Sequence, residues 1–263
     1  VREVHLDYLR AGADVVTSAS YQATVAGFMK RGFSEEEAAA LITKSVHLAQ
    51  EARDLYLAER GGDGAVPLVA ASVGPYGAYL ADGSEYRGDY DIDEDALTAF
   101  HAGRLAILAA VQPDLLACET LPCLVEARAI VRALRQEDIH IPAWFSFSCR
   151  DVAHISDGTE IAACARFLND VPEVAAIGLN CTAPQYVEEL IRAIRSETAK
   201  PIVVYPNSGE HYDTSDQSWH GTAEDFGTTA QRWYAAGARL IGGCCRTSPR
   251  MIAEIAAWTK KME

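Results

Sequence analysis

Three of the seven cysteines follow hydrophobic, strand-like segments, and their positions could bring three sulfur atoms together. Cys181 lies in the segment GLNCTAP, and Cys244 and Cys245 are adjacent in GGCCRTSP. Three thiolates suit zinc, which favours sulfur ligands in tetrahedral geometry. Three protein ligands would leave the fourth position open, which is typical of catalytic zinc sites and not of structural ones.

The adjacent pair has other interpretations. Neighbouring residues of a regular strand point to opposite faces, so Cys244 and Cys245 must lie in the turn beyond the strand, where Gly242 and Gly243 permit irregular backbone. Small buried cysteines are common in protein cores. A redox pair is a further alternative, although the usual C-x-x-C spacing is lacking. The spacing by itself leaves zinc, packing and redox chemistry open.

Glu119 also follows a strand-like segment, in LLACETLP. A carboxylate at the mouth of a parallel sheet could hold a substrate ammonium group or act as a base. Because Pro122 indicates that a helix opens nearby, a charge close to a helix start is the alternative.

Seven β-then-α units must position these residues. Short apolar segments bounded by Gly, Pro and polar residues are typical of strands buried on both faces of a parallel sheet. The predicted strands are 13–18, 67–72, 114–118, 142–146, 175–179, 201–205 and 238–241. The predicted helices are 34–59, with Ser34 as N-cap, and 93–111, 124–135, 159–169, 185–197, 222–236 and 249–260. Two longer connections, 74–91 and 208–220, follow strand ends, where barrels carry their active sites.

Alternating units of this length predict either a doubly wound sheet or a closed barrel. No G-x-G-x-x-G segment is present, which weakens the nucleotide-binding doubly wound sheet. Closure takes eight strands, and residues 1–12 have a helical pattern with no strand before them. We therefore expect an α/β fold, a single-domain (β/α)8 TIM-like barrel over residues 1–263, with the first strand apparently absent. A seven-stranded sheet with a leading helix is the alternative.

Composition limits the classes of partner. Hydrophobic residues make up 49% and charged residues 23%, as in soluble globular proteins. The net charge of -14 argues against nucleic acid and anionic membranes as partners. The charged, amphipathic start does not resemble a signal peptide, and the odd number of cysteines favours a reducing compartment, so we expect a cytoplasmic protein.

Taken together, the motifs resemble one family. GLNCTAP and GGCCRTSP resemble the two zinc-ligand motifs of the homocysteine S-methyltransferases. GADVVTSASYQAT, ASVGPYGAYLADGSEYRGDY, CETLP and YPNSGEHYD, with the later Trp219, are similar to that family's strand ends along nearly the whole chain. Two departures stand out: the family's first strand with its Asp-Gly pair is not seen, and Arg246 follows the cysteine pair where many relatives have Gly.

The resemblance implies a zinc ion held by Cys181, Cys244 and Cys245, and a contact between Glu119 and the amino group of homocysteine. It also implies a pocket lined by Tyr21 and by the turn of Ser72, Val73 and Gly74. Zinc would deprotonate the homocysteine thiol, making it the nucleophile that takes a methyl group to give methionine.

The methyl donor implied is a sulfonium, because the short chain and the YPNSGE segment resemble the S-methylmethionine-dependent branch; S-adenosylmethionine is the alternative donor. Aromatic rings bind such cations on their faces. The candidates are Tyr76, Tyr79, Tyr86 and Trp219. Two other functions stay open: a zinc or redox barrel protein with structural cysteines, and a barrel enzyme such as an aldolase. The second would need a lysine at a strand end, which the sequence does not offer.

Overall fold

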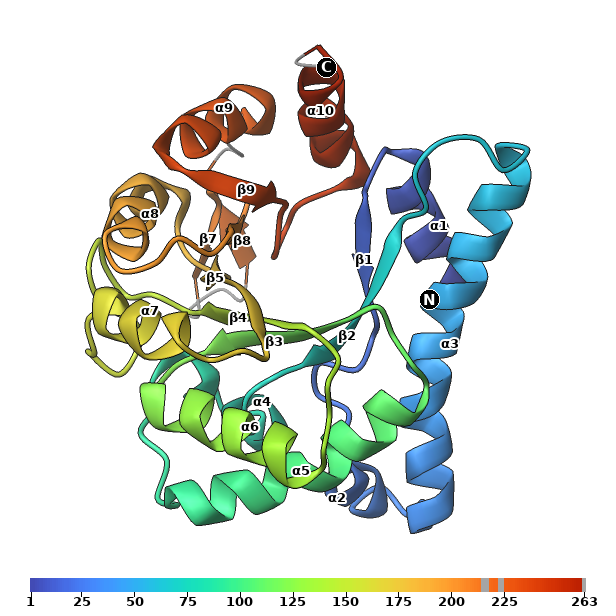
Figure 1. Cartoon of the computed structure of the whole chain (residues 1–263), viewed down its shortest axis with the longest axis vertical. Coiled ribbons are helices and arrows are strands. Elements are labelled where there is room, and N and C mark those ends of the chain that lie inside the picture. Colours follow the sequence, from blue (N-terminus) through green and yellow to red (C-terminus); the bar gives the residue numbers. More distant parts are fainter. Residues whose placement is uncertain (214–217, 222–224, 262–263) are drawn as a thin grey trace.

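The computed structural model describes residues 1–213, 218–221 and 225–261, apart from the side chains of 211–219. Helices surround a curled parallel sheet in an α/β arrangement (Figure 1). The sheet contains β1 (Val15–Thr17), β2 (Leu68–Val73), β3 (Leu115–Leu121), β4 (Ala143–Phe147), β5 (Val174–Asn180), β6 (Ile202–Tyr205) and β9 (Ala238–Ile241). These segments confirm the seven predicted strands to within a few residues.

The seven strands pair in the order β1-β2-β3-β4-β5-β6-β9, and every pair is parallel. Since each strand follows the one before it around the sheet, the sheet curls as in a TIM barrel and its two edge strands face each other across an opening (Figure 1). Closure would take one more parallel strand between β1 and β9. That the barrel's first strand is absent stays a prediction.

Strand residues alternate between two different environments. Val69, Leu116, Phe145, Ile177 and Val204 point outward into the main hydrophobic core beneath the helices. Their neighbours along the strands point inward and form a separate, smaller cluster, most of whose members are alanines. The inward cluster contains Ala70, Ala117, Trp144, Ala176 and Val203. Because small side chains fill so little of the interior, space remains there for a cavity.

The helices begin where capping chemistry predicts. Ser34 caps its helix through the amide of Glu37, and the Glu37 side chain accepts in return from the Ser34 amide, which makes a complete capping box. The helices are α1 (Arg2–Arg10), α2 (Val25–Met29), α3 (Glu35–Glu59), α4 (Tyr76–Leu80), α5 (Glu94–Ala110), α6 (Leu124–Gln136), α7 (Ile161–Asn169), α8 (Val187–Arg195), α9 (Phe226–Ala236) and α10 (Pro249–Thr259). Of the predicted helix 222–236, residues 222–224 lie outside the described residues.

The two long connections contain secondary structure that the sequence did not indicate. The first carries the short helix α4 and a 3-10 turn, η1 (Ser84–Tyr86). The second carries an antiparallel hairpin of β7 (His211–Asp213) and β8 (Ser218–His220). A second 3-10 turn, η2 (Pro184–Tyr186), precedes α8. Elements of three to five residues are too short for hydrophobic periodicity to reveal.

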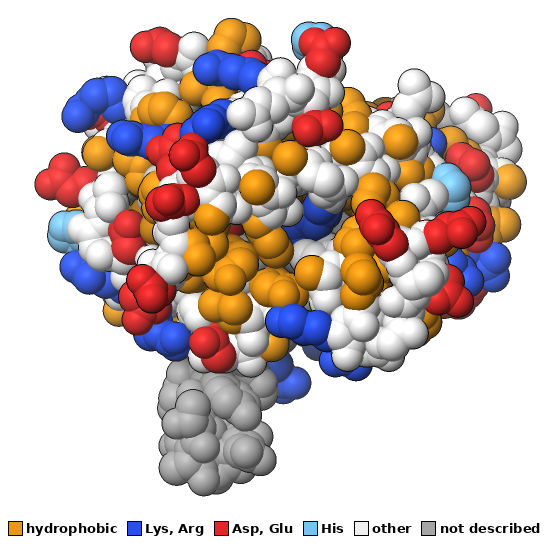
Figure 2. Space-filling view, turned by 90° about the horizontal axis from the view of Figure 1, so that it is seen from below, with side chains coloured by type: hydrophobic (Ala, Val, Ile, Leu, Met, Phe, Trp, Pro, Cys, Tyr) orange, Lys and Arg blue, Asp and Glu red, His pale blue; other side chains and the backbone are white. Residues whose placement is uncertain are grey.

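The surface agrees with the composition. Acidic and basic side chains are interspersed over the described part of the face in Figure 2, and no continuous basic area lies there. Among the described helices, none has the length and hydropathy needed to cross a membrane.

Alanine substitutions at two glycines, one in a tightly packed strand and one on an open helix surface, test how closely β5 and β6 pack. A Cβ on Gly178 in β5 would lie 1.6 Å from the carbonyl oxygen of Val203 in β6, whereas a Cβ on Gly103 in α5 meets no atom within 4 Å. We expect Gly178→Ala to lower the free energy of unfolding by about 3 kcal/mol or more. Gly103→Ala should raise it by about 0.5–1 kcal/mol, because alanine favours helix. Urea denaturation measures both, and equal effects would contradict the close approach of β5 and β6.

Candidate active site

A cavity of about 850 Å³ lies inside the curl of the sheet and continues into the opening between β1 and β9. Its walls combine residues at the carboxyl ends of the strands with residues of α1, β1 and α10. The residues used below that line it are Tyr21, Tyr86, Glu119, Thr120, Trp144, Asn180, Cys181, Tyr205, Cys244 and Cys245. The cavity lies at the end of the sheet where TIM barrels carry their active sites.

The three predicted cysteines meet at this cavity. Cys181 follows β5, and Cys244 and Cys245 lie in the turn after β9, as the side-chain alternation required. That turn is held to the end of β6: the amide of Cys244 donates to the carbonyl of Pro206 at 2.8 Å, and the amide of Ser208 donates to the carbonyl of Cys245 at 3.0 Å. The three sulfur atoms lie within 4.8 Å of one another.

In this structure Cys181 and Cys244 form a disulfide, and the Cys245 sulfur lies 3.9 Å from that of Cys181. Burial raises the pKa of the Cys245 thiol, so this thiol stays protonated near neutral pH unless a cation stabilises its thiolate. After reduction, three soft donors at these separations match the donor set that zinc prefers.

Glu119 lies at the end of β3 and is 9% exposed. Burial raises the pKa of its carboxyl, and hydrogen bonds from the hydroxyls of Ser72 and Tyr205 oppose the shift. The Tyr205 oxygen accepts from the indole N–H of Trp144 at 2.9 Å and lies 2.6 Å from the Ser146 hydroxyl oxygen. Glu119 is therefore an oriented acid in the cavity wall with polar neighbours on both sides.

Asn180 joins this acid to the sulfur cluster. Its Oδ1 accepts from the amide of Thr120 at 2.7 Å and from the Ser146 hydroxyl at 2.8 Å, and its Nδ2 donates to the Thr120 hydroxyl at 2.7 Å. Thr120 follows Glu119 with φ +59°, and Cys181 follows Asn180 with φ +47°. Both are left-handed backbone positions that β-branched and most other side chains rarely adopt, so the buried Asn180 amide holds a strained turn at the site.

Some of the other predicted site residues line the cavity and others do not. The rings of Tyr21 and Tyr86 line the cavity. Ser72, Val73 and Gly74 lie behind the wall, where Ser72 reaches the cavity through Glu119.

Tyr76 and Tyr79 do not line the cavity but pack against Phe100, with ring centroids 5.0 and 5.4 Å away. The Trp219 side chain lies outside the described residues. Asn180, Tyr205 and Trp144 were not predicted as site residues. Side chains two residues apart on a strand point to the same face, so this periodicity could have indicated that they face the interior of the sheet.

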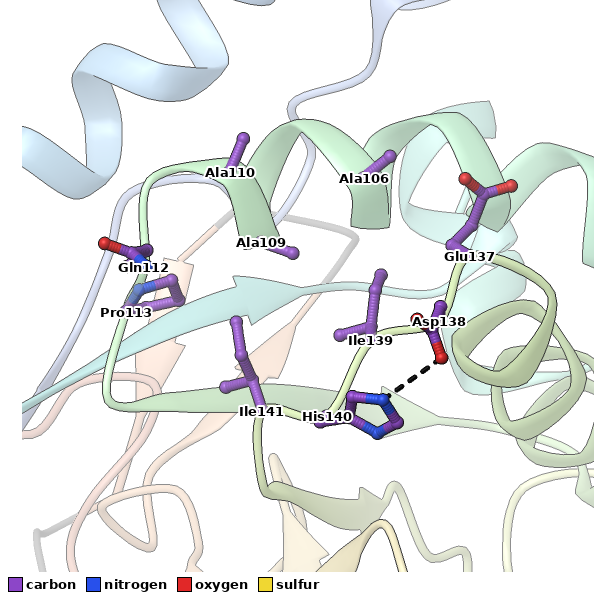
Figure 3. A pocket seen from close by; sticks show the side chains of 10 residues that line it. All are labelled: Ala106, Ala109, Ala110, Gln112, Pro113, Glu137, Asp138, Ile139, His140 and Ile141. Carbon is purple, nitrogen blue, oxygen red and sulfur yellow. Dashed lines mark ion pairs between the residues drawn. The ribbon is translucent and has the colours of Figure 1, made fainter.

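A second hollow, of about 380 Å³, lies at the opposite end of the strands (Figure 3). It is lined by the carboxyl end of α5 and the connection from α6 to β4, and half of its lining residues are alanine or isoleucine. Its one drawn ion pair, between Asp138 and His140, is almost fully exposed. Nothing among its described residues matches the chemistry of the larger cavity.

Comparison with known proteins agrees with this geometry. The homocysteine S-methyltransferase family model matches residues 1–259. The chain belongs to the homocysteine S-methyltransferase family. Homocysteine S-methyltransferase YbgG of Bacillus subtilis (strain 168) is 52% identical over 267 residues, which cover 100% of this chain and 84% of that protein. Homocysteine S-methyltransferase of Escherichia coli (strain K12) is 51% identical over 260 residues, which cover 98% and 83%.

The fold comparison points the same way. The metallated crystal form of the homocysteine methyltransferase MmuM from Escherichia coli superposes with a TM-score of 0.88 at 48% identity, covering 98% of this chain and 83% of that one. The oxidized form of MmuM gives a TM-score of 0.87. This chain is accordingly a methyltransferase that acts on a small molecule, homocysteine.

The environment of Glu119 predicts how stability depends on pH. A buried carboxyl with a raised pKa favours the fold while it is protonated, and this contribution is lost as the pH rises through its folded-state pKa. Glu119→Gln stays neutral, so its free energy of unfolding relative to wild type should increase from about pH 4 to about pH 8. The gain is about 1.4 kcal/mol for each unit by which the pKa is raised. Urea denaturation across this range, with the exposed Glu137→Gln as control, measures it; parallel curves for Glu119→Gln and wild type would contradict it.

Proposed function

We propose that this methyltransferase uses a zinc ion held by Cys181, Cys244 and Cys245 to transfer a methyl group from S-methylmethionine to the sulfur of homocysteine, giving methionine. The observation that carries the proposal is the convergence of three sulfur atoms within 4.8 Å beside a buried carboxyl in one cavity. MmuM, which is 48% identical to this chain, has a metallated form, and this supports a metal in the proposed site.

The donor set fits zinc because all three candidate ligands are sulfur, and because all three line the cavity a substrate thiol there could serve as the fourth ligand. When bound, zinc supplies a Lewis acid that lowers the pKa of the acceptor thiol, so that the thiolate is present at neutral pH. For all three cysteines to act as ligands, cellular thiols must first reduce the Cys181–Cys244 disulfide by two electrons, since a disulfide sulfur is a poor metal ligand. Three free thiols persist in a reducing compartment, which is the basis for proposing a cytoplasmic location.

The chain's own residues orient the acceptor. Glu119, once ionised, faces the cavity as the partner of the homocysteine ammonium group, and hydrogen bonds from Ser72 and Tyr205 set the direction of its oxygens. With the amino group held at β3 and the sulfur held at the ends of β5 and β9, the acceptor spans the cavity in one orientation. Holding both reactants in line contributes much of the rate acceleration in such a displacement.

The donor carries a positive sulfonium charge that disappears as its methyl group leaves. Of the aromatic residues predicted to hold it, Tyr86 is the one whose described ring lines the cavity. Tyr86 is 48% exposed, and it lines the same cavity as the three sulfur atoms. We assign Tyr86 the cation–π contact with the donor.

We also propose that residues 1–263 belong to a single catalytic domain, and that its sheet closes as an eight-stranded barrel when one further strand pairs with β1 and β9. The facing edges of β1 and β9, with the cavity running between them, support a further parallel strand there. Slow hydrogen exchange of the β1 and β9 edge amides in the active enzyme is expected, and exchange as fast as at a free edge would contradict it.

A second candidate is a redox protein with structural cysteines, favoured by the Cys181–Cys244 disulfide. It predicts a reversible dithiol without metal and without methyl transfer. The same preparation distinguishes the two functions, because metal content and methionine formation are both measured on reduced protein.

Removing one sulfur ligand tests the metal proposal. We expect reduced wild-type protein to bind about one zinc per chain and to form methionine from homocysteine, faster with S-methylmethionine than with S-adenosylmethionine. Cys245→Ser should lose zinc and lower the rate at least about a hundredfold. Cys164→Ser, which changes a buried cysteine of α7, serves as the control and should keep both. Reduced wild-type protein without zinc would contradict the proposal.

Changing the ring of Tyr86 tests donor binding. Tyr86→Ala should raise the donor KM about 3- to 30-fold, because a cation–π contact is lost, and should leave the homocysteine KM unchanged. Tyr86→Phe keeps the ring face and should stay near wild type. Tyr79→Ala removes a tyrosine outside the cavity and is the matched control. An unchanged donor KM in Tyr86→Ala would refute the assignment.

A further inference from the structure

Three ionisable side chains are buried outside the cavity, where the proposed reaction does not use them. His101 and Arg104 lie on α5 and Glu126 lies on α6, and their exposed fractions are 0%, 3% and 0%. None of the three lines the cavity. Burying charged groups is costly unless they are paired and hydrogen-bonded, so their arrangement calls for a function.

The two hydrogen bonds that join these three side chains are consistent with only one assignment of donor and acceptor atoms. Arg104 Nη2 lies 2.8 Å from His101 Nδ1, and because a guanidinium group only donates, Nδ1 must accept. His101 is therefore neutral with its proton on Nε2, which donates to Glu126 Oε1 at 2.8 Å. Burial is the main cause that lowers the pKa of His101, in agreement with the neutral ring. Burial lowers the pKa of Arg104 only to about 10, so Arg104 stays charged opposite Glu126.

Both ends of this network hold the backbone of one turn. Arg104 Nη2 donates to the carbonyl of Gly74 at 2.6 Å, and Glu126 Oε1 accepts from the amide of Tyr76 at 2.5 Å. These groups belong to the segment that leaves β2 and enters α4. Charged partners give hydrogen bonds stronger than neutral ones, so the turn is held from behind by an ionic clamp.

The turn contacts Tyr21 of the cavity wall directly, and it is connected to Glu119 through Ser72 of β2. A Cβ on Gly74 would lie 2.4 Å from the Tyr21 carbonyl oxygen and 2.6 Å from its ring, so the two segments touch directly. Ser72, two residues earlier, donates to Glu119. A shift of the turn by a fraction of an ångström would therefore displace both the Tyr21 ring and the hydrogen bond that orients Glu119.

We propose that Arg104, His101 and Glu126 are positioning residues for homocysteine, which act by holding the turn between β2 and α4 against Tyr21 and Glu119. The inference rests on the proposed contact of Glu119 with the substrate amino group. The three residues touch no substrate; they set the place of the residues that do. Loss of the clamp should therefore change the affinity for homocysteine, with little change in metal content or in donor KM.

Arg104→Met tests the clamp, because it removes both hydrogen bonds of the guanidinium and keeps an apolar stem. We expect the homocysteine KM and its calorimetric Kd to rise about tenfold, with kcat and donor KM within about twofold of wild type and zinc content unchanged. Arg104→Lys keeps a donor in this position and should recover most of the affinity. Arg132→Met removes an exposed ion pair, to Asp95, between the same two helices and should leave the KM unchanged.

A second variant addresses folding. Arg104→Met leaves Glu126 as an unpaired buried charge, so if it does not fold, Arg104→Met with Glu126→Gln removes both charges and keeps an acceptor for the Tyr76 amide. This double variant should melt close to wild type and still bind homocysteine about tenfold more weakly. A folded variant of either kind with a homocysteine Kd within twofold of wild type would overturn the proposal.

Nuclear magnetic resonance of the His101 ring nitrogens in wild-type protein gives an independent readout. A neutral ring with its proton on Nε2 is expected, and a charged ring or a proton on Nδ1 would overturn the network. This measurement does not need turnover. If the His101 ring is neutral with its proton on Nε2 but wild-type protein makes no methionine, the proposed function fails. The calorimetric Kd of the Arg104 variants then decides whether the clamp positions the homocysteine site.

Discussion

Three sulfur atoms within 4.8 Å of one another cannot all carry negative charge unless a cation lies among them. A bound cation, protonation or a disulfide each removes this repulsion, and in this structure Cys181 and Cys244 form a disulfide. The proposed zinc ion and the disulfide would each satisfy this electrostatic constraint. The neighbouring polar residues are arranged around this cluster, with the buried Glu119 at the end of β3 and the Asn180 amide next to Cys181.

The curled parallel sheet meets the constraint through its geometry. All the strands end on one side, so residues far apart in sequence meet where β5, β6 and β9 finish. The inward positions nearer the amino ends are mostly alanines, which leave room for substrates, and those nearer the carboxyl ends are polar. The polar layer contains Ser72, Glu119, Ser146 and Tyr205, which hydrogen-bond to one another and so avoid the cost of unsatisfied buried groups.

Rigid support for this layer comes from two kinds of contact. Inside the curl, the Asn180 amide holds the left-handed Thr120 next to Glu119 and itself precedes Cys181. Outside it, the Arg104, His101 and Glu126 network holds the turn that follows β2. Buried hydrogen bonds are stronger where water is excluded, so both devices keep small side chains in place around an otherwise open cavity.

The sequence alone predicted the seven strands and most of the helices, and it placed the three cysteines and Glu119 at strand ends, since hydrophobic runs, caps and strand-end motifs are local signals. It did not determine that Tyr76 and Tyr79 pack against Phe100 away from the cavity while Tyr86 lines it, because the direction of a ring in a connecting segment depends on the helices packed beneath it. Only the tertiary structure revealed Asn180 and Tyr205 in the cavity wall and the Arg104 network behind the turn that follows β2. Each hydrogen-bonds to a partner some 30 to 60 residues away in the sequence, so only the folded chain brings the two together.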